Sequence, residues 1–349
     1  MDTDFGSLER ERYSRQELFK AIGADSRDIL SGQKVLIAGC GGLGSVSADM
    51  MTRAGVGTLT IIDRDLVELS NLQRQTLFDE SDVREGYPKA VAAKKKLVAI
   101  NSNVKVQAIV DDISRLNIDA MFSGADIVID GTDNFETRFL INEYCVREGI
   151  PWIFGACAGS QGMTMTIIPG KTPCFRCVFD SVPRSERALN SETVGVIAPI
   201  VNTIAAWQCS EALKLLVKDF DAINRDLLTI DVWQCEINAT HLPEKKHSDC
   251  PVCDYRQFRF LDGKYGSAYI SLQGDRAIQI IPFEPREVDL LKLAIDLSQH
   301  GDPMYNQYML RLEVDEYEIT IFPNGRAVIK GTTDSGIARD LYTKYVINE

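Results

Sequence analysis

The chain has 349 residues, of which 45% are apolar and 25% are charged, and its 38 basic and 50 acidic side chains give a net charge of −12. These fractions are ordinary for a globular protein and exclude the collagen, coiled-coil and disordered classes. The negative charge argues against a nucleic-acid partner, because phosphate binding needs a positive field. The sequence has no apolar run of about 18 residues and no apolar signal-peptide core. We therefore expect a cytoplasmic protein of about two domains with no membrane partner.

The first two thirds of the chain alternate strand and helix patterns. An apolar run at 34–38 leads into the glycine-rich segment 39–44, a helical pattern that reaches Ala54, and a second apolar run at 59–62. This unit opens a doubly wound, mostly parallel α/β fold of the Rossmann-like kind. The alternation then predicts helices over 88–100, 115–121, 134–148 and 199–217, and strands over 104–110, 126–130 and within 151–168.

After Cys253 the sequence lacks both cysteine and the βα alternation. Asn324-Gly325, between two alternating runs, predicts a hairpin turn. The other elements expected here are strands near 267–271, 277–281, 308–313, 316–322 and 326–330, and helices over 285–298 and 334–346. The predicted organisation is a helical arm at 1–30, an α/β domain at 31–253 and a small α+β domain at 254–349.

The glycines at 39, 41 and 44 follow a predicted strand and open a predicted helix. Such a loop, with Gly42 inside it, lets a phosphate approach backbone N–H groups at a helix N-terminus. Asp63 ends the next strand, where a carboxylate can accept hydrogen bonds from a ribose. These features fit any nucleotide, dinucleotides most commonly, and do not distinguish ATP from NAD. A glycine turn that only packs is the alternative without a ligand.

Charged residues that could serve phosphate chemistry follow this loop and precede it. Hydride transfer needs no extra cations, whereas nucleotidyl transfer needs them to offset developing charge, and Arg15, Arg74 and Lys89 are candidates. Asp133 follows a predicted strand, where its carboxylate could hold Mg²⁺. From the residues alone, plainer alternatives stay open: a solvated helix face for Lys89, simple exposure for Arg15, and a helix N-cap for Asp133.

Four of the nine cysteines form two C-x-x-C pairs, Cys174/Cys177 and Cys250/Cys253. In a reducing compartment such pairs indicate zinc rather than disulfides. A closed site of four thiolates leaves no position for water, so we expect a structural Zn²⁺. A redox role is the weaker alternative, because neither pair begins a helix after a strand.

Taken in order, the segments RYSRQ, GCGGLGS, DRD, SNLQRQ, PKA and DGTDN and the two C-x-x-C pairs resemble the ThiF/MoeB family of adenylyltransferases, bacterial relatives of ubiquitin-activating enzymes. The resemblance covers about residues 9–253. It implies ATP- and Mg²⁺-dependent adenylation of the C-terminal glycine of a ubiquitin-like sulfur carrier ending in Gly-Gly, for thiamine or molybdenum-cofactor type biosynthesis. The domain at 31–253 would then be an adenylation domain with a zinc site, and 254–349 an accessory module of the kind carried by some longer bacterial members.

The resemblance also implies roles for particular residues. Arg15 matches an arginine that reaches into the active site of the other subunit, which implies a homodimer with two composite sites. The remaining matches are the ribose ligand Asp63 with its neighbour Asp65, the phosphate-binding Arg74 and Lys89, the Mg²⁺-binding Asp133, and the lining residues Asn71 and Gln75.

One position departs from the family pattern. Some members carry a cysteine, used for a covalent bond to the carrier, where this chain has Ser191. A serine is a far poorer nucleophile than a thiolate and cannot carry a persulfide. We therefore expect an adenylate that is released without a covalent thioester or acyl-disulfide step. Cys40 and Cys157 are expected to be packed rather than reactive.

Three other functions stay open at this point. The first is adenylation of a different carboxylate, on a short peptide or a tRNA-linked amino acid. The second is an NAD-dependent oxidoreductase, which shares the glycine loop and Asp63 but leaves the cations without a purpose. The third is a scaffold without catalysis, which would lose nothing if Lys89 or Asp133 were replaced.

Overall fold

The computed structural model describes residues 5–179, 194–242, 249–263, 269–272, 276–282 and 287–347. The chain divides into two compact units, Met1–Lys264 and Tyr265–Glu349. No helix within the described ranges is both long enough and apolar enough to cross a bilayer.

The first unit is built on an eight-stranded sheet of order β3-β2-β1-β4-β5-β6-β7-β8. The strands β1 to β5 pair in parallel, and β6, β7 and β8 continue the sheet antiparallel. The strands are β1 (Lys34–Ala38), β2 (Thr58–Ile62), β3 (Lys105–Ile109), β4 (Ile127–Asp130), β5 (Trp152–Ala158), β6 (Gln161–Ile167), β7 (Leu227–Asp231) and β8 (Glu236–Thr240). This large, mostly parallel sheet confirms the α/β class predicted from the alternation.

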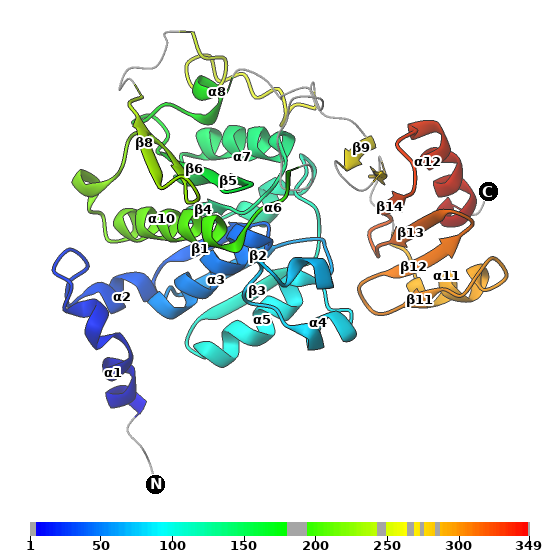
Figure 1. Cartoon of the computed structure of the whole chain (residues 1–349), viewed down its shortest axis with the longest axis horizontal. Coiled ribbons are helices and arrows are strands. Elements are labelled where there is room, and N and C mark those ends of the chain that lie inside the picture. Colours follow the sequence, from blue (N-terminus) through cyan, green and yellow to red (C-terminus); the bar gives the residue numbers. More distant parts are fainter. Residues whose placement is uncertain are drawn as a thin grey trace. The chain divides into compact units, whose positions relative to one another are not determined.

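Helices cover both faces of this sheet. Figure 1 shows α7 and α10 on opposite sides of β5 and β6. The helices are α1 (Phe5–Glu17), α2 (Ser26–Ser31), α3 (Gly42–Ala54), α4 (Glu80–Arg84), α5 (Lys89–Ile100), α6 (Ile118–Phe122), α7 (Phe135–Glu148), α8 (Phe175–Val178) and α10 (Ala198–Leu216), with short turns at Leu69–Asn71 and Phe220–Ala222.

The central strands β1 and β4 are buried on both sides, because successive side chains enter opposite cores. In β1, Val35 and Ile37 pack with α3, α5 and α10, whereas Leu36 and Ala38 pack with α6 and α7. A parallel sheet covered on both faces brings the carboxyl ends of its strands to one edge, which is where ligands bind in this fold class.

The second unit holds a six-stranded antiparallel sheet of order β11-β12-β13-β14-β10-β9, with two helices that share its apolar core. Its elements are β9 (Tyr269–Leu272), β10 (Ala277–Ile280), α11 (Leu290–Leu297), β11 (Met304–Tyr305), β12 (Leu310–Val314), β13 (Tyr317–Ile321), β14 (Ala327–Lys330) and α12 (Ser335–Tyr342), followed by a π-helical turn at Thr343–Ile347. The hairpin expected at Asn324-Gly325 joins β13 and β14, with Gly325 in the left-handed region at φ 79°.

Three helix predictions are wrong at their ends. The helix expected over 115–121 is α6, which begins at Ile118, because the Asn117 side chain accepts from the Ser114 N–H and donates to the Asp112 carbonyl in a turn. The helix expected over 285–298 is α11. It begins after Asp289, whose carboxylate caps it by accepting from two backbone N–H groups. The helix expected over 334–346 stops at Tyr342 and continues as the π-helical turn.

The predicted elements include neither β7 nor β8. All five residues of β8 are exposed, so this edge strand carries no alternation of apolar and polar residues that a pattern search could detect.

Candidate active site

The glycine-rich loop joins β1 to α3 and needs glycine at two positions. Gly39 has φ +86°, and a Cβ there would lie 2.8 Å from the Gly131 carbonyl oxygen. A Cβ at Gly44 would lie 1.8 Å from the Gly39 carbonyl oxygen. Gly42 begins α3, and a Cβ added at Gly41 would lie 3.8 Å from the Gln75 amide nitrogen, at ordinary van der Waals distance. Free N–H groups at the positive end of a helix form an anion site.

Asp63, at the end of β2, lies directly against this loop. Its carboxylate accepts from the backbone N–H of Cys40 at 2.6 Å and from that of Asp65 at 2.7 Å. The side chain is only 9% exposed. Burial, with a smaller contribution from Asp65, raises the pKa of Asp63 to about 6, although the Lys89 ammonium acts in the opposite direction.

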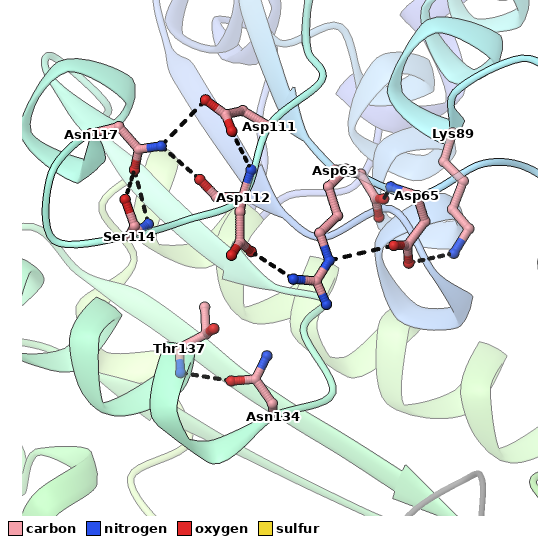
Figure 2. Close-up of polar contacts among 10 residues, drawn as sticks. Asp63, Asp65, Lys89, Asp111, Asp112, Ser114, Asn117, Asn134 and Thr137 are labelled. Atoms are coloured by element: carbon pink, nitrogen blue, oxygen red, sulfur yellow. Dashed lines mark hydrogen bonds and ion pairs between the residues drawn. The ribbon is translucent and has the colours of Figure 1, made fainter. Parts of the chain in front are cut away.

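A chain of ion pairs runs from Lys89 across the ends of β2 and β3. The Lys89 Nζ lies 3.0 Å from Asp65 Oδ2, and Asp65 Oδ1 lies 3.5 Å from the Arg64 guanidinium. Arg64 also lies 3.2 Å from Asp112 Oδ1. Figure 2 shows Lys89 directed toward Asp65, with Asp63 beside it. Burial disfavours the Lys89 charge, but Asp65 and Asp63 outweigh it, so the pKa of Lys89 lies above its usual value.

The segment after Leu69 contains two buried amides, one of which, Gln75, lies near the loop. Asn71 is 8% exposed and Gln75 is 2% exposed. Within the described ranges, the buried Oδ1 of Asn71 and Oε1 of Gln75 have no hydrogen-bond donor. The Gln75 amide nitrogen is the group nearest to Gly41. Arg74 is half-buried and donates to the Ser70 carbonyl at 3.1 Å. Buried acceptors without a donor are what a site for a hydrogen-bonding ligand requires.

Asp133 projects from the turn between β4 and α7 and is exposed. It is not the N-cap of α7, since Asn134 takes that place by accepting from the Thr137 N–H at 2.8 Å. The cap alternative considered for Asp133 is therefore wrong. Its carboxylate contributes to the raised pKa values of Arg64 and Lys89, which places it near both cations.

Beneath this turn lies a buried polar network that sequence reasoning missed. Arg138 Nε lies 3.0 Å from Asp130 Oδ2, and its NH2 group donates to the Gly155 carbonyl at 3.0 Å. Gln208 Nε2 donates to the carbonyls of Asp130 (2.8 Å) and Ile153 (3.1 Å). The network ties β4 to β5. The available signal was that Arg138 and Gln208 are polar residues within helices that bury mostly apolar ones.

The structure does not bring Arg15 to this site. It is exposed on α1, which is attached by a hydrogen bond from Asn101 Nδ2 to the Tyr13 hydroxyl (2.8 Å) and one from Gln16 to the Ala54 carbonyl (3.1 Å). Ala54 is the last residue of α3, and a 13-residue helix is about 20 Å long. Arg15 therefore lies near the end of α3 that is remote from the glycine loop.

The four paired cysteines converge. All four sulfur atoms lie within 4.8 Å of one another. Cys174 Sγ lies 3.8 Å from both Cys177 Sγ and Cys250 Sγ, and Cys177 Sγ lies 3.5 Å from Cys253 Sγ. Zinc–sulfur bonds of about 2.3 Å in a tetrahedron require sulfur separations of about 3.8 Å, so the four thiols fit a zinc ion.

Of the two cysteines expected to be packed, Cys40 is buried and Cys157 is partly buried. Burial raises the pKa of the Cys40 thiol well above its usual value. It also raises that of Cys157 to about 12. Both thiols are thus protonated near neutral pH and are poor nucleophiles. Ser191 lies outside the described residues.

The pKa of Asp63 leads to a pH prediction. If the ionised carboxylate receives the ribose hydroxyls, protonation removes an acceptor, so nucleotide affinity should fall as the pH drops through about 6. Calorimetric titration with ATP and Mg²⁺ between pH 5 and 8 measures this. ATP itself titrates in this range, so Asp63→Asn serves as the reference. A wild-type profile parallel to that of the variant would contradict the prediction.

A glycine loop at a helix N-terminus, with carboxylates after β2 and β4 and a buried lysine beside them, defines a Rossmann-like nucleotide-binding enzyme. The model of the ThiF family matches residues 13–252, and the chain belongs to that family. It is an adenylyltransferase of this group, as the names of its relatives also indicate.

Two curated relatives and one solved structure illustrate the likeness. The chain is 40% identical to the sulfur carrier protein ThiS adenylyltransferase of Bacillus subtilis, over 96% of this chain and 99% of that protein. It is 34% identical to the SAMP-activating enzyme E1 of Haloferax volcanii, over 72% of this chain and 92% of that one. The crystal structure of E. coli MccB with ATP superimposes with a TM-score of 0.61 at 28% identity, covering 69% of this chain and 74% of MccB.

Proposed function

We propose that this protein uses ATP and Mg²⁺ to adenylate the C-terminal glycine of a ubiquitin-like sulfur carrier ending in Gly-Gly, in thiamine or molybdenum-cofactor type biosynthesis. The observation that carries the proposal is the buried Lys89 ammonium, which pairs with Asp65 and acts on the Asp63 carboxylate that accepts from the glycine loop. A cation there serves triphosphate chemistry and has no use in hydride transfer. The nearly full-length likeness to a ThiS adenylyltransferase supports the choice of substrate class.

The proposed reaction needs no general base. A carboxylate oxygen of the carrier's last glycine attacks the α-phosphorus of ATP, the bond to the bridging oxygen of the β-phosphate breaks, and pyrophosphate leaves with that electron pair. The carboxylate is already an anion, so positioning and charge neutralisation supply the catalysis. Lys89 and Arg74 would bind phosphate oxygens, and Asp63, with Asp65, would hold the ribose. Asp133 would hold Mg²⁺, which supplies further positive charge when bound.

The position of Arg15 supports a homodimer in this proposal. Arg15 lies far from the glycine loop of its own chain. If it acts at an active site, as the resemblance implies, that site belongs to a second copy of the chain. A composite site of this kind would make activity depend on protein concentration. The four clustered cysteines would hold a structural Zn²⁺ that ties the segment around Cys174 to that around Cys250.

ATP–pyrophosphate exchange with Mg²⁺ tests the proposal. We expect exchange with a Gly-Gly carrier and none with the same carrier lacking its last glycine. Exchange with a short peptide alone would instead favour the alternative carboxylate substrate, which the likeness to MccB suggests only weakly. Absence of ATP binding, or binding of NADH seen by its fluorescence, would contradict adenylation.

A further inference from the structure

Helix α7 contacts the segments that carry both cysteine pairs, although it contributes no cysteine to the cluster. On one side, Asn142 Oδ1 accepts from the Phe175 N–H at 2.9 Å, and Phe175 stands between Cys174 and Cys177. The Phe139 ring meets Phe175 edge to face, with centroids 5.1 Å apart. The same ring stacks on Phe260 from the second segment, at 5.3 Å and 7°. One helix therefore holds both halves of the cluster.

Glu143 is the polar part of the second attachment. Its Oε2 accepts from the backbone N–H groups of Phe260 (2.8 Å) and Leu261 (3.0 Å). These residues follow the second cysteine pair in the chain, and the carboxylate is only 2% exposed. Burial raises the pKa of Glu143 to about 7, with Asp262 acting in the same direction and the backbone N–H groups opposing it. An apolar side chain at this position would avoid the desolvation cost of a buried carboxylate. The hydrogen bonds that Glu143 makes to the second segment must therefore offset that cost.

The segment from Cys250 to Leu261, which Glu143 holds, has little regular structure of its own. It contains short turns and no helix or strand of its own, with bonds such as that from the Gln257 N–H to the Pro251 carbonyl. The cysteine pairs it must join are 76 residues apart in the chain. Without an attachment to the core, bringing Cys250 and Cys253 to the other pair would cost the entropy of closing that loop. If the segment is already attached to the core when the metal binds, the entropy of closing the loop is lost on folding, and metal binding is correspondingly tighter.

We propose that Glu143 is a positioning residue for the metal site, holding the segment from Cys250 to Leu261 against α7 so that all four sulfur atoms stay within ligand distance and the metal is retained. This inference rests on the proposed zinc site and does not depend on adenylation. Residues that orient metal ligands from outside the ligand set typically change metal affinity about 10- to 100-fold when they are altered.

The experiment measures the rate at which zinc leaves the purified full-length protein. A chromophoric chelator reports the release, and elemental analysis gives the zinc content at the start. Glu143→Ala should release zinc about 10- to 100-fold faster than the wild type. Glu143→Gln, which keeps one acceptor oxygen, should fall between them. Asn142→Ala, which removes the attachment of the first segment, should also release zinc faster.

Two control variants separate positioning from general loss of stability. Glu148→Gln alters an exposed carboxylate at the end of the same helix and should leave the release rate unchanged. Glu211→Gln alters an equally buried carboxylate whose partners lie outside the cysteine segments: the Asn224 N–H (2.9 Å), the Thr166 hydroxyl (3.2 Å) and the Lys214 ammonium. Equal acceleration by Glu211→Gln would overturn the proposal, as would an unchanged rate in folded Glu143→Ala and Glu143→Gln proteins. Wild-type protein that binds no zinc would overturn it too, whereas failure of pyrophosphate exchange would leave it standing.

Discussion

Replacing Lys89 with methionine should lower ATP–pyrophosphate exchange by about 10²- to 10³-fold, the loss typical when one preorganised group that stabilises transition-state charge is removed from an active site. The side chain is buried, and its ammonium pairs with Asp65 beside the glycine loop. Methionine has nearly the same length as lysine and can occupy the space of the buried lysine methylene groups. Asp65 is half-exposed and stays hydrated without its partner, so the variant should fold. The rate of label exchange at saturating carrier measures the effect.

Lys94→Met is the matched control, because Lys94 lies exposed on the same helix and should be dispensable. A second readout separates loss of the charge from loss of the fold. Lys89 lowers the pKa of Asp63, so Lys89→Met should raise that pKa. The pH at which ATP binding is lost should therefore be higher in the variant than in the wild type. Exchange at the wild-type rate in Lys89→Met would show that the lysine has no part in the chemistry.

The strands and helices of the nucleotide-binding half could be predicted because their signals are local. The apolar run of β1, the glycines after it and Asp63 at the end of β2 stand within about 30 residues, the length of one βαβ unit. Their spacing alone predicts a loop at a helix N-terminus beside a carboxylate. The structure adds the direct bond from the Cys40 N–H to Asp63.

Contacts between residues far apart in the chain could not be predicted. Nothing near Lys89 in the sequence indicates that Asp65, which is 24 positions earlier, is its partner, or that Asp112 pairs with Arg64. Gln208 lies 78 positions from Asp130, to whose carbonyl it donates. Such pairs depend on which strand ends the topology brings to one edge of the sheet, and a single sequence does not contain that information. Helix starts were uncertain for a different reason, since side-chain caps such as Asp289 decide them locally.

Replacing Arg138 with methionine should destabilise the first unit by about 3–5 kcal/mol, because it leaves the fully buried Asp130 carboxylate without its counter-charge. It also removes the donor to the Gly155 carbonyl and with it a hydrogen bond between α7 and β5. The pKa of Asp130 is already raised by burial, and Arg138 opposes that rise. Denaturant unfolding measures the loss. The three tryptophans Trp152, Trp207 and Trp233 all lie in the first unit, so their fluorescence reports on that unit.

The pH dependence of this loss of stability follows from the direction in which the pKa of Asp130 shifts. Without Arg138 the folded-state pKa of Asp130 rises further above its unfolded value, so the folded state holds a proton that the unfolded state releases. Stability of Arg138→Met should therefore fall as the pH rises above the unfolded value, and the deficit should be larger at pH 8 than at pH 5. The double variant Asp130→Asn/Arg138→Met removes the charge itself and should recover part of the stability at pH 8. Arg138→Lys keeps the charge but not the fork of donors, so it should lie between the wild type and Arg138→Met. An Arg138→Met protein as stable as the wild type at both pH values would mean that Asp130 is neutral in the native protein, and that the network holds β4 to β5 through Gln208 instead.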